Sequence, residues 1–345
     1  MTAHVVHFDA WRSLAGEQQE SIVDQIMARA RAGGFPHFRL SREQRLCRFS
    51  ELTAFDRSAL LKDGAIGSSN HGLGLCWHYH PHHWAVKCAG ARTAVQTWES
   101  DDHLRSAIRK AITQPYFRWS HTHDDVGPYL SPSHLRAALR RASSVQRVSN
   151  FRPTAAALLY DRFCRGATWD PCAGFGGRLL GAIASPEVRR YVACDPATQT
   201  ASGLRRMIGD MAHLTSTACE IHKTPAEEFT PPRREFDLVM TSPPYGRTEV
   251  YSDEPTQSCH RYPIAAAWTE GFLRPVIQRA AYSLVPRGRL LLNVANTRQH
   301  PTLVDDVERV ACEEGFAVEP TLLMAISSVR KGGFKTEPIL SFRLR

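Results

Sequence analysis

The feature that most constrains how this chain can fold is a regular alternation that begins near Thr168 and runs to the carboxyl end. Short apolar runs of strand length alternate there with segments long enough for helices, a pattern typical of βα units and a mainly parallel sheet. The last two runs are joined by a short basic link that contains glycine, which predicts an antiparallel hairpin at the end of the sheet. We expect seven strands, at residues 167–171, 191–195, 218–222, 236–242, 288–294, 316–325 and 338–344.

The 345 residues exceed the usual size of one compact domain, so two structural units are expected. Residues 146–345 are predicted to form an α/β domain built on a seven-stranded Rossmann-like sheet, with a helix at residues 264–284. Residues 1–145 lack this rhythm and are predicted to form an accessory or substrate-recognition region of mixed α+β structure. Helices are expected there at residues 17–32, 101–113 and 133–142, with short strands and turns from Gly64 to Trp98.

Composition narrows the class of protein and of partner. Hydrophobic residues make up 43% and charged residues 22% of the chain, as in ordinary folded proteins. The formal net charge of +9 favours a polyanionic partner such as nucleic acid. The nine cysteines are dispersed and odd in number, which predicts reduced thiols in a cytoplasmic protein. The chain shows neither a leader pattern nor a run of about eighteen apolar residues, so no membrane segment is expected.

A glycine-rich turn follows the first expected strand, in the segment WDPCAGFGG from Trp169 to Gly177. Asp170 ends the strand, and the glycines open a helix at Arg178. Glycines let the backbone approach a ligand closely, and the first helical turn offers unpaired N–H groups, so a cofactor fits here. The spacing departs from G-x-G-x-x-G, which makes a nicotinamide dinucleotide the poorer interpretation. Tight packing of strand against helix is the alternative that needs no ligand.

Two further strand ends carry acidic residues suited to a nucleoside. Asp195 and Pro196 end the second expected strand, where a carboxylate can accept hydrogen bonds from both ribose hydroxyls of a cofactor. After the third strand, Ala226 and Glu227 lie where a carboxylate could reach an adenine amino group. The alternatives are a solvent-facing aspartate at a strand end and the N-terminal cap of a helix.

The segment with the most specific chemistry is Ser242–Pro243–Pro244–Tyr245, at the carboxyl end of the fourth expected strand. Two consecutive prolines hold the backbone extended and remove two N–H donors, which leaves carbonyl acceptors beside a hydroxyl and an aromatic ring. Such a site suits a flat amino group on an aromatic ring: the Pro243 carbonyl and Ser242 would hold the N–H groups, and Tyr245 would stack on the ring. Positioning, without a strong base, would carry the rate. A simple proline turn is the alternative, which the place of this segment after the glycine turn disfavours.

Together these motifs resemble the class I S-adenosylmethionine-dependent amino-methyltransferases, which methylate exocyclic nitrogens in DNA. DPCAGFGG is similar to the cofactor motif of that family, TSPPYG to its catalytic motif, and SNFRPT at 149–154 to the segment that cups the methionine end of the cofactor. Serine at position 242 is more typical of the cytosine N4 enzymes than of the adenine N6 enzymes. The resemblance covers residues 146–345. A set of bacterial and phage DNA-methyltransferase-like proteins is similar over a longer span, which includes YSDEPTQS at 251–258.

The resemblance implies a methyltransferase sheet, S-adenosyl-L-methionine as cofactor and methyl transfer to a base flipped out of DNA, with cytosine N4 favoured over adenine N6. Ser242, Pro243, Pro244 and Tyr245 are the implied catalytic residues. With the strand ends described above, the expected cofactor-binding residues are Asn150, Phe151, Arg152, Pro153, Thr154, Asp170, Pro171, Ala173, Gly174, Phe175, Gly176, Gly177, Asp195, Pro196, Ala226 and Glu227.

Other substrates stay open at this point. The sheet is expected to finish at Arg345, without the sizeable target-recognition region of restriction-type enzymes, so recognition would fall to residues 1–145 or to the loop at 247–263. RNA or a small biosynthetic molecule is therefore the alternative substrate. A non-catalytic nucleic-acid binder with the same fold is the third hypothesis. The sequence does not indicate an oligomeric state.

Histidines and arginines in the amino-terminal region form the remaining candidate clusters. In an extended segment His78, His80 and His82 would share one face, but a second pair of ligands is not evident, so we predict no metal site. Contact with substrate, contact with phosphate and simple packing are all open for these histidines. Two groups of basic residues are expected to form either a stripe that contacts a nucleic-acid backbone or the solvated faces of helices: Arg105, Arg109 and Lys110, and Arg136, Arg140, Arg141 and Arg147.

Overall fold

The chain divides into two compact units. The computed structural model describes residues 4–6, 8–62, 65–67, 69–88, 90–113, 119–121, 130–142, 148–328 and 334–345, so that Arg147 and most of the link between the last two strands lie outside the described residues. Unit 1 comprises Met1–Phe38 with Pro81–Val148, and unit 2 comprises Arg39–His80 with Ser149–Arg345. This division differs from a single boundary near residue 145, because apolar side chains of residues 39–80 pack into the core of unit 2.

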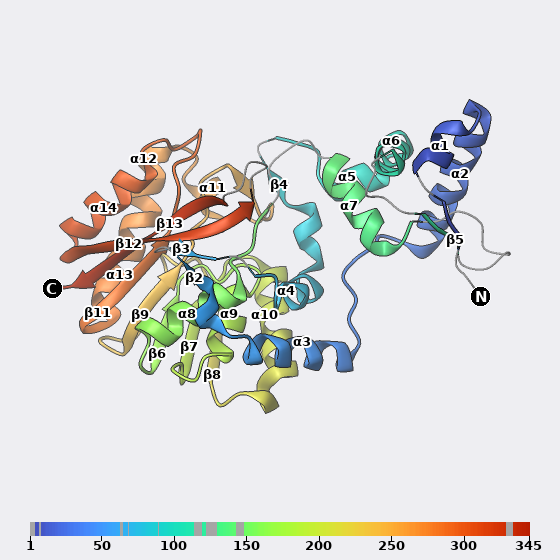
Figure 1. Cartoon of the computed structure of the whole chain (residues 1–345). Coiled ribbons are helices and arrows are strands. Elements are labelled where there is room, and N and C mark those ends of the chain that lie inside the picture. The colour runs from blue at the N-terminus through green and yellow to red at the C-terminus, as the bar shows by residue number, and fades with distance from the viewer. Residues whose placement is uncertain are drawn as a thin grey trace. The chain divides into compact units, whose positions relative to one another are not determined.

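Unit 1 is mainly helical (Figure 1). Its helices pack around an apolar core that includes Trp11, Ile26, Trp98, Leu104 and Leu139. The strands β1 and β5 form a small antiparallel sheet, which supplies part of the β structure expected for this region. The three helices predicted here are present as α2, α6 and α7. The elements are β1 (His4–Val6), α1 (Phe8–Ser13), α2 (Gly16–Gly33), the 3₁₀ helix η2 (Pro81–Ala85), β4 (Lys87–Cys88), α5 (Ala94–Glu99), α6 (Asp101–Ile112), β5 (Trp119–His121) and α7 (Pro132–Ala142).

Unit 2 is a Rossmann-like α/β fold (Figure 1). Its strands are β2 (Leu61–Lys62), β3 (Ala65–Ile66), β6 (Ala167–Asp170), β7 (Arg190–Cys194), β8 (Ala218–His222), β9 (Phe236–Thr241), β10 (Glu249–Val250), β11 (Leu284–Asn293), β12 (Phe316–Ser328) and β13 (Phe334–Leu344). Its helices are α3 (Arg42–Ala54), η1 (Arg57–Leu60), α4 (Leu73–Tyr79), α8 (Pro153–Phe163), α9 (Gly177–Ile183), α10 (Thr198–Met211), η3 (Ala212–Leu214), α11 (Ser258–Arg261), α12 (Ala265–Trp268), the π-helix η4 (Thr269–Leu273), α13 (Arg274–Ser283) and α14 (Leu303–Glu313).

The central sheet has nine described strands in the order β2-β3-β12-β13-β11-β9-β6-β7-β8. Seven of them are the strands expected from the sequence, and β2 and β3 are additional. The strands from β11 through β8 run parallel, and β13 lies antiparallel between β11 and β12. The predicted hairpin of β12 and β13 is present, but it does not end the sheet, because β3 pairs with β12.

The order of the strands identifies where a ligand would bind. From β6 the chain adds β7 and β8 on one side and then returns to place β9 on the other side of β6. The direction of winding therefore reverses between β6 and β9. In open α/β sheets, ligands bind outside the carboxyl ends of the strands at such a switch point.

Alternating side chains of the strands build one core on each face of the sheet. Tyr191 and Ala193 of β7 belong to the core that contains α8, α9 and α10, whereas Val192 and Cys194 belong to the core that contains α13 and α14. The helix predicted at 264–284 is present as α12, η4 and α13, which lie on this second face. In the described part of the chain, none of the helices combines the length and the apolar character needed to cross a membrane.

Candidate active site

The two expected motifs meet at the carboxyl ends of β6 and β9, on either side of the switch point. Thr241 ends β9, and its hydroxyl donates to Asp170 Oδ1 at 2.8 Å. The same hydroxyl accepts from the backbone N–H of Cys172 at 3.1 Å. Because Thr241 precedes Ser242 directly, this pair of hydrogen bonds holds the glycine turn and the Ser-Pro-Pro-Tyr turn side by side.

Asp170 is fully buried and serves as an anchor for this junction. Its Oδ2 accepts from Arg178 Nε at 2.8 Å and from the Tyr191 hydroxyl at 2.8 Å. Arg178 is buried as well, and its guanidinium also donates to the carbonyl of Cys172. A buried ion pair is tolerated only when its remaining hydrogen-bonding groups are satisfied, as they are here. Asp170 therefore holds the shape of the glycine turn through contacts within the protein. Its hydrogen-bond partners Arg178 and Thr241 were not predicted from the sequence.

The glycine turn has the close approaches that its composition predicts. Gly174 and Gly176 have φ values of 56° and 78°, in the region that favours glycine. At Gly177, the first residue of α9, an added Cβ would lie 2.0 Å from the carbonyl oxygen of Phe151. Asn150 Nδ2 donates to the carbonyl of Phe175 at 3.2 Å. The segment before α8 thus lies directly on the glycine turn.

The rest of this segment leads into α8 and is largely buried. Pro153 is the first residue of α8, and the Thr154 side chain is fully buried, with no hydrogen-bond partner for its hydroxyl among the described residues. Arg152 bonds to the side chain of Asn70, and burial lowers its pKa. The Phe151 ring lies 5.5 Å from the Arg178 guanidinium. Pro171 and Ala173 of the glycine turn are buried as well.

Asp195 lies at the end of β7 and contacts the glycine turn directly. Its Oδ2 accepts from the N–H of Gly174 at 3.1 Å, and its Oδ1 accepts from the N–H of Ala197 at 2.9 Å. Burial raises the pKa of Asp195 to about 7, against the opposing effect of these two donors. Pro196 beside it is half-buried. Asp195 is only 9% exposed, so the alternative of a solvent-facing aspartate is wrong.

Ala226 and Glu227 lie in a turn after β8, and no helix begins there. Ala226 is buried in the core of the second face. Glu227 is 6% exposed and forms an ion pair with Arg261 at 2.7 Å. Burial raises the pKa of Glu227, and Arg261 opposes this effect. The carboxylate that was expected to face an adenine amino group thus has a cationic partner that the sequence did not indicate.

The Ser-Pro-Pro-Tyr turn lies at the edge of the second-face core. Pro243 is buried, and Ser242, Pro244 and Tyr245 are half-buried. Tyr245 packs against that core, and its hydroxyl donates to the carbonyl of Asn293, the last residue of β11, at 3.3 Å. Burial raises the pKa of Tyr245. In the described part of the chain no hydrogen bond occupies the carbonyl of Pro243, so this acceptor is available to a ligand.

Two carboxyl groups that no sequence motif indicated lie near this turn. Glu249 is 8% exposed and accepts from the Tyr251 hydroxyl. Burial, with a smaller effect from the negative charge of Glu337, raises the pKa of Glu249 to about 7. Burial also raises the pKa of Glu337, which belongs to β13. Two carboxyl groups, one from β10 and one from β13, therefore lie near Tyr245.

The chain that follows Tyr245 runs past the ends of three strands of the sheet. The Tyr251 ring lies 5.9 Å from the Phe175 ring of the glycine turn. The carboxylate of Glu254 accepts from the N–H and the hydroxyl of Thr198, at 2.8 and 2.9 Å. Arg261 then pairs with Glu227 after β8. This segment, which was one of the candidates for substrate recognition, thus lies along the residues expected to hold a cofactor.

The histidines of the amino-terminal region do not form the extended face that was predicted. His78 is in the helix α4, which begins after Gly72, a residue with a φ of 81°, and His80 follows at its end. Leu75, Cys76 and Tyr79 of this helix are buried, and this apolar face favours a helix over a strand. His80 is fully buried, with its Nδ1 2.9 Å from the carbonyl of Cys76. Among the described residues, no three side chains of His, Cys, Asp or Glu gather as metal ligands would.

Similar solved structures exist for about half of this chain, and no family model and no curated protein matches the sequence. A methyltransferase from Pyrococcus furiosus is 13% identical with a TM-score of 0.39, and the match covers 55% of this chain and 82% of that chain. The N-methyltransferase NodS from Bradyrhizobium japonicum WM9, in complex with S-adenosyl-L-homocysteine, is 13% identical with a TM-score of 0.37, over 55% and 84% of the two chains. Precorrin-6y C5,15-methyltransferase from Geobacter metallireducens GS-15 is 16% identical with a TM-score of 0.36, over 55% and 87%. The strand order of unit 2 is by itself that of a Rossmann-like sheet.

Proposed function

We propose that this chain transfers a methyl group from S-adenosylmethionine to an exocyclic amino group of a DNA base, with N4 of cytosine favoured over N6 of adenine. The observation that carries the proposal is the hydrogen bond from Thr241 to Asp170, which joins the ends of β9 and β6. It holds a glycine turn suited to a nucleoside cofactor beside a turn suited to a flat amino group, and both lie at the switch point of the sheet. The resemblance of both motifs to the amino-methyltransferases supports the same reaction.

Residues around the glycine turn fit the cofactor. Each oxygen of Asp195 accepts one backbone N–H and can accept a further hydrogen bond, so that the two ribose hydroxyls have acceptors. We assign the methionine end to Asn150–Thr154 with Gly174–Gly177, and the adenine to Ala226 and Glu227. When bound, the cofactor supplies an electrophilic methyl group on a sulfonium.

The Ser-Pro-Pro-Tyr turn is assigned to the base. The Pro243 carbonyl accepts one N–H of the amino group and Ser242 accepts the other, which leaves the nitrogen lone pair directed away from both. Tyr245, held by its bond to Asn293, provides the aromatic surface against the base. The stacked amino group of duplex DNA is out of reach, so the base is flipped out at a cost of a few kcal/mol that contacts in the site offset. The amino group loses its proton during or after the transfer, and positioning carries the rate.

The test is transfer of labelled methyl from S-adenosylmethionine to unmethylated genomic DNA, followed by digestion and mass identification of the nucleoside. We expect N4-methyldeoxycytidine from the wild type. The double variant S242A/Y245A should lose transfer and keep nearly the same cofactor affinity, whereas Y282A, at a tyrosine on α13 that is 49% exposed, should change neither. Full turnover by the double variant would overturn the site assignment. Cofactor binding with product only on RNA or on a small molecule would replace DNA as the substrate.

A further inference from the structure

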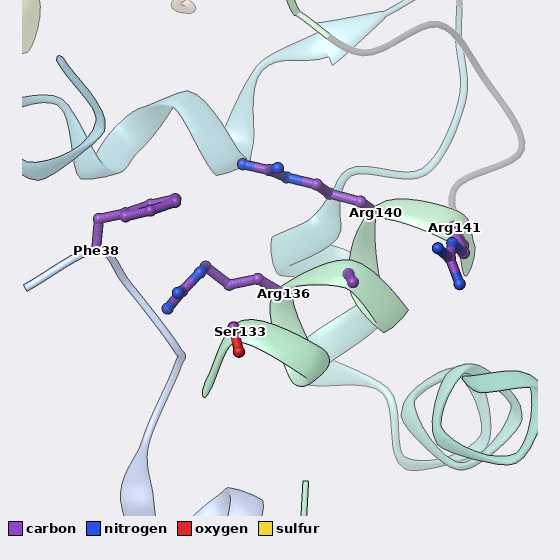
Figure 2. Close-up of a pocket in the computed structure, with 6 residues that line it drawn as sticks. Phe38, Ser133, Arg136, Arg140 and Arg141 are labelled. Carbon is purple, nitrogen blue, oxygen red and sulfur yellow. The ribbon is translucent and has the colours of Figure 1, made fainter. Parts of the chain in front are cut away.

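Unit 1 contains a pocket beside α7 with a strongly cationic lining. Its volume is about 400 Å³, and it is lined by Phe38, Ser133, Arg136, Ala137, Arg140 and Arg141 (Figure 2). No carboxylate is among these residues, and half of them are arginines from a single helix. Figure 2 shows Arg136 and Arg140 extending from α7 toward the Phe38 ring.

Arg136 is the best-defined cation of this pocket. Its guanidinium lies 4.2 Å from the centre of the Phe38 ring and donates to the carbonyl of Pro36 at 3.3 Å. Burial lowers its pKa, so the surroundings already disfavour the charge. In the part of the chain that the structure describes, no carboxylate pairs with Arg136. A partly buried cation in this situation gains from an anionic ligand.

Two arginines of α6, unlike Arg136, form ion pairs with carboxylates of unit 1. Arg105 forms ion pairs with Glu20 and Asp24 of α2, and Arg109 pairs with Glu20. These two arginines, which were expected as part of a stripe for nucleic acid, therefore link two helices. From the second group singled out in the sequence, Arg136, Arg140 and Arg141 of α7 line the pocket.

The geometry of this lining suits a chain of phosphates. Arg136 and Arg140 are about one helical turn apart, which is about 6 Å along the helix axis. The helix therefore presents two separate positive charges, which can contact two phosphates. Aromatic rings restrain both groups: the Arg140 guanidinium lies 4.7 Å from the centre of the Trp84 ring and 6.0 Å from that of Phe38. A restrained guanidinium loses less conformational freedom when it binds a phosphate with two parallel hydrogen bonds.

We propose that the α7 pocket, with Arg136 and Arg140 as its main contacts, binds the phosphodiester backbone of DNA. This inference rests on the proposed function and adds to it a substrate contact in unit 1, apart from the site that holds the base. Contacts of this kind position a nucleic acid and carry no sequence information by themselves.

The experiment measures binding of a short fluorescent DNA duplex to the full chain by anisotropy across a series of salt concentrations. For R136Q/R140Q we expect about tenfold weaker binding at low salt, and a slope of log K against log salt that is smaller by about 2, because two phosphate contacts are lost. The matched control R92Q/K110Q removes two charges from exposed positions of unit 1 that do not line the pocket, and should leave the slope nearly unchanged. R136K/R140K keeps the charge and should keep the slope. Circular dichroism checks that each variant is folded.

The outcomes separate this inference from the proposed function. A wild-type slope in folded R136Q/R140Q, in a protein that does methylate DNA, would refute the pocket and leave the function standing. Equal losses in R136Q/R140Q and in the control would show a diffuse charge effect and also refute the pocket. If the wild type binds RNA but no DNA duplex, the commitment to DNA is overturned together with the proposed substrate.

Discussion

Gly177 is the residue at which the glycine turn tolerates a side chain least. An added Cβ would meet the Phe151 carbonyl at 2.0 Å and Asn150 Oδ1 at 3.0 Å. Neither atom belongs to a flexible side-chain end that could move without cost, because Asn150 is itself bonded to the turn. The substitution must therefore displace the segment before α8, one of the segments assigned to the cofactor.

We predict that G177A lowers the stability of the protein by about 1–3 kcal/mol, as overpacking usually does, and weakens binding of S-adenosylmethionine at least tenfold. Thermal denaturation and titration calorimetry measure the two effects. G209A is the matched control: it lies in α10, an added Cβ has no atom within 4 Å, and alanine favours a helix by up to about 1 kcal/mol. If G177A and G209A have the same stability and the same cofactor affinity, the close approach at Gly177 does not matter for cofactor binding.

At the level of residues, motifs could be predicted from the sequence but their partners could not. The glycine turn and the Ser-Pro-Pro-Tyr turn each have a local signature, and both are found at strand ends. Thr241 is bonded to Asp170 across 71 positions of sequence, and no local pattern indicates such a pair. The same limit applies to Arg261, whose bond to Glu227 depends on how a loop folds back.

At the level of elements, the junction of β6 and β9 determines how the two turns meet. Thr241 donates to Asp170 and accepts from Cys172, so valine at this position would leave a backbone N–H and a buried carboxylate each short of one partner. Thr168, on the adjacent strand β6, is also fully buried, but its hydroxyl has no partner among the described residues. The two threonines therefore test the same substitution with and without hydrogen bonds.

We predict that T241V destabilises the protein by about 1–3 kcal/mol and lowers kcat, because the buried Asp170 carboxylate and the Cys172 N–H each lose a hydrogen bond. T168V should be neutral or slightly stabilising, since it replaces a buried, unpaired hydroxyl with a methyl group of similar shape. Urea denaturation with a steady-state transfer assay gives both quantities. A T241V protein as stable and active as T168V would mean that the junction does not hold the site together.

The elements themselves were predicted to different degrees. The seven expected strands carry short runs rich in apolar residues, and all of them are present near their expected bounds. The strands β2 and β3 have two residues each, too few to show a period of two, and their place in the central sheet was not predicted, although short strands were expected from Gly64 onward. Alternating histidines suggested a strand at 78–82, whereas the apolar spacing of Leu75, Cys76 and Tyr79 produces α4.

At the level of the whole molecule, the division into units was harder to predict than the fold of either unit. Residues 39–80 carry no βα rhythm, yet Phe49, Leu52 and Leu75 are buried in the core of unit 2. Their partners lie far away in the sequence, on α8 and α9 and on the sheet. Composition along the chain does not reveal such contacts. For this reason the domain expected from residue 146 onward does not include residues 39–80, which belong to unit 2.

Asp195 contributes to the pH dependence of the whole molecule, because burial raises its pKa to about 7. In the unfolded chain its pKa is near 3.9, so the folded state binds the proton more tightly. The resulting stabilisation is complete below about pH 4 and is lost as the pH rises toward 7. Cofactor binding should respond in the opposite direction, because the protonated carboxyl group offers one acceptor fewer to the ribose hydroxyls. Affinity is then expected to rise as the pH increases through 7, by up to tenfold for each unit below the pKa.

The variant D195N isolates this group, because it removes the titration while other carboxyl groups such as Glu249 remain. We predict that the stability of the wild type, relative to D195N, decreases between pH 4 and pH 7, as measured by urea denaturation across that range. Over the same range, calorimetry should show cofactor affinity rising in the wild type and staying flat, at a weaker value, in D195N. Parallel stability curves would mean that Asp195 stays ionised in the folded protein. Parallel affinity curves would mean that its carboxylate does not hold the ribose, because a group that titrates at the ribose must couple proton loss to cofactor binding.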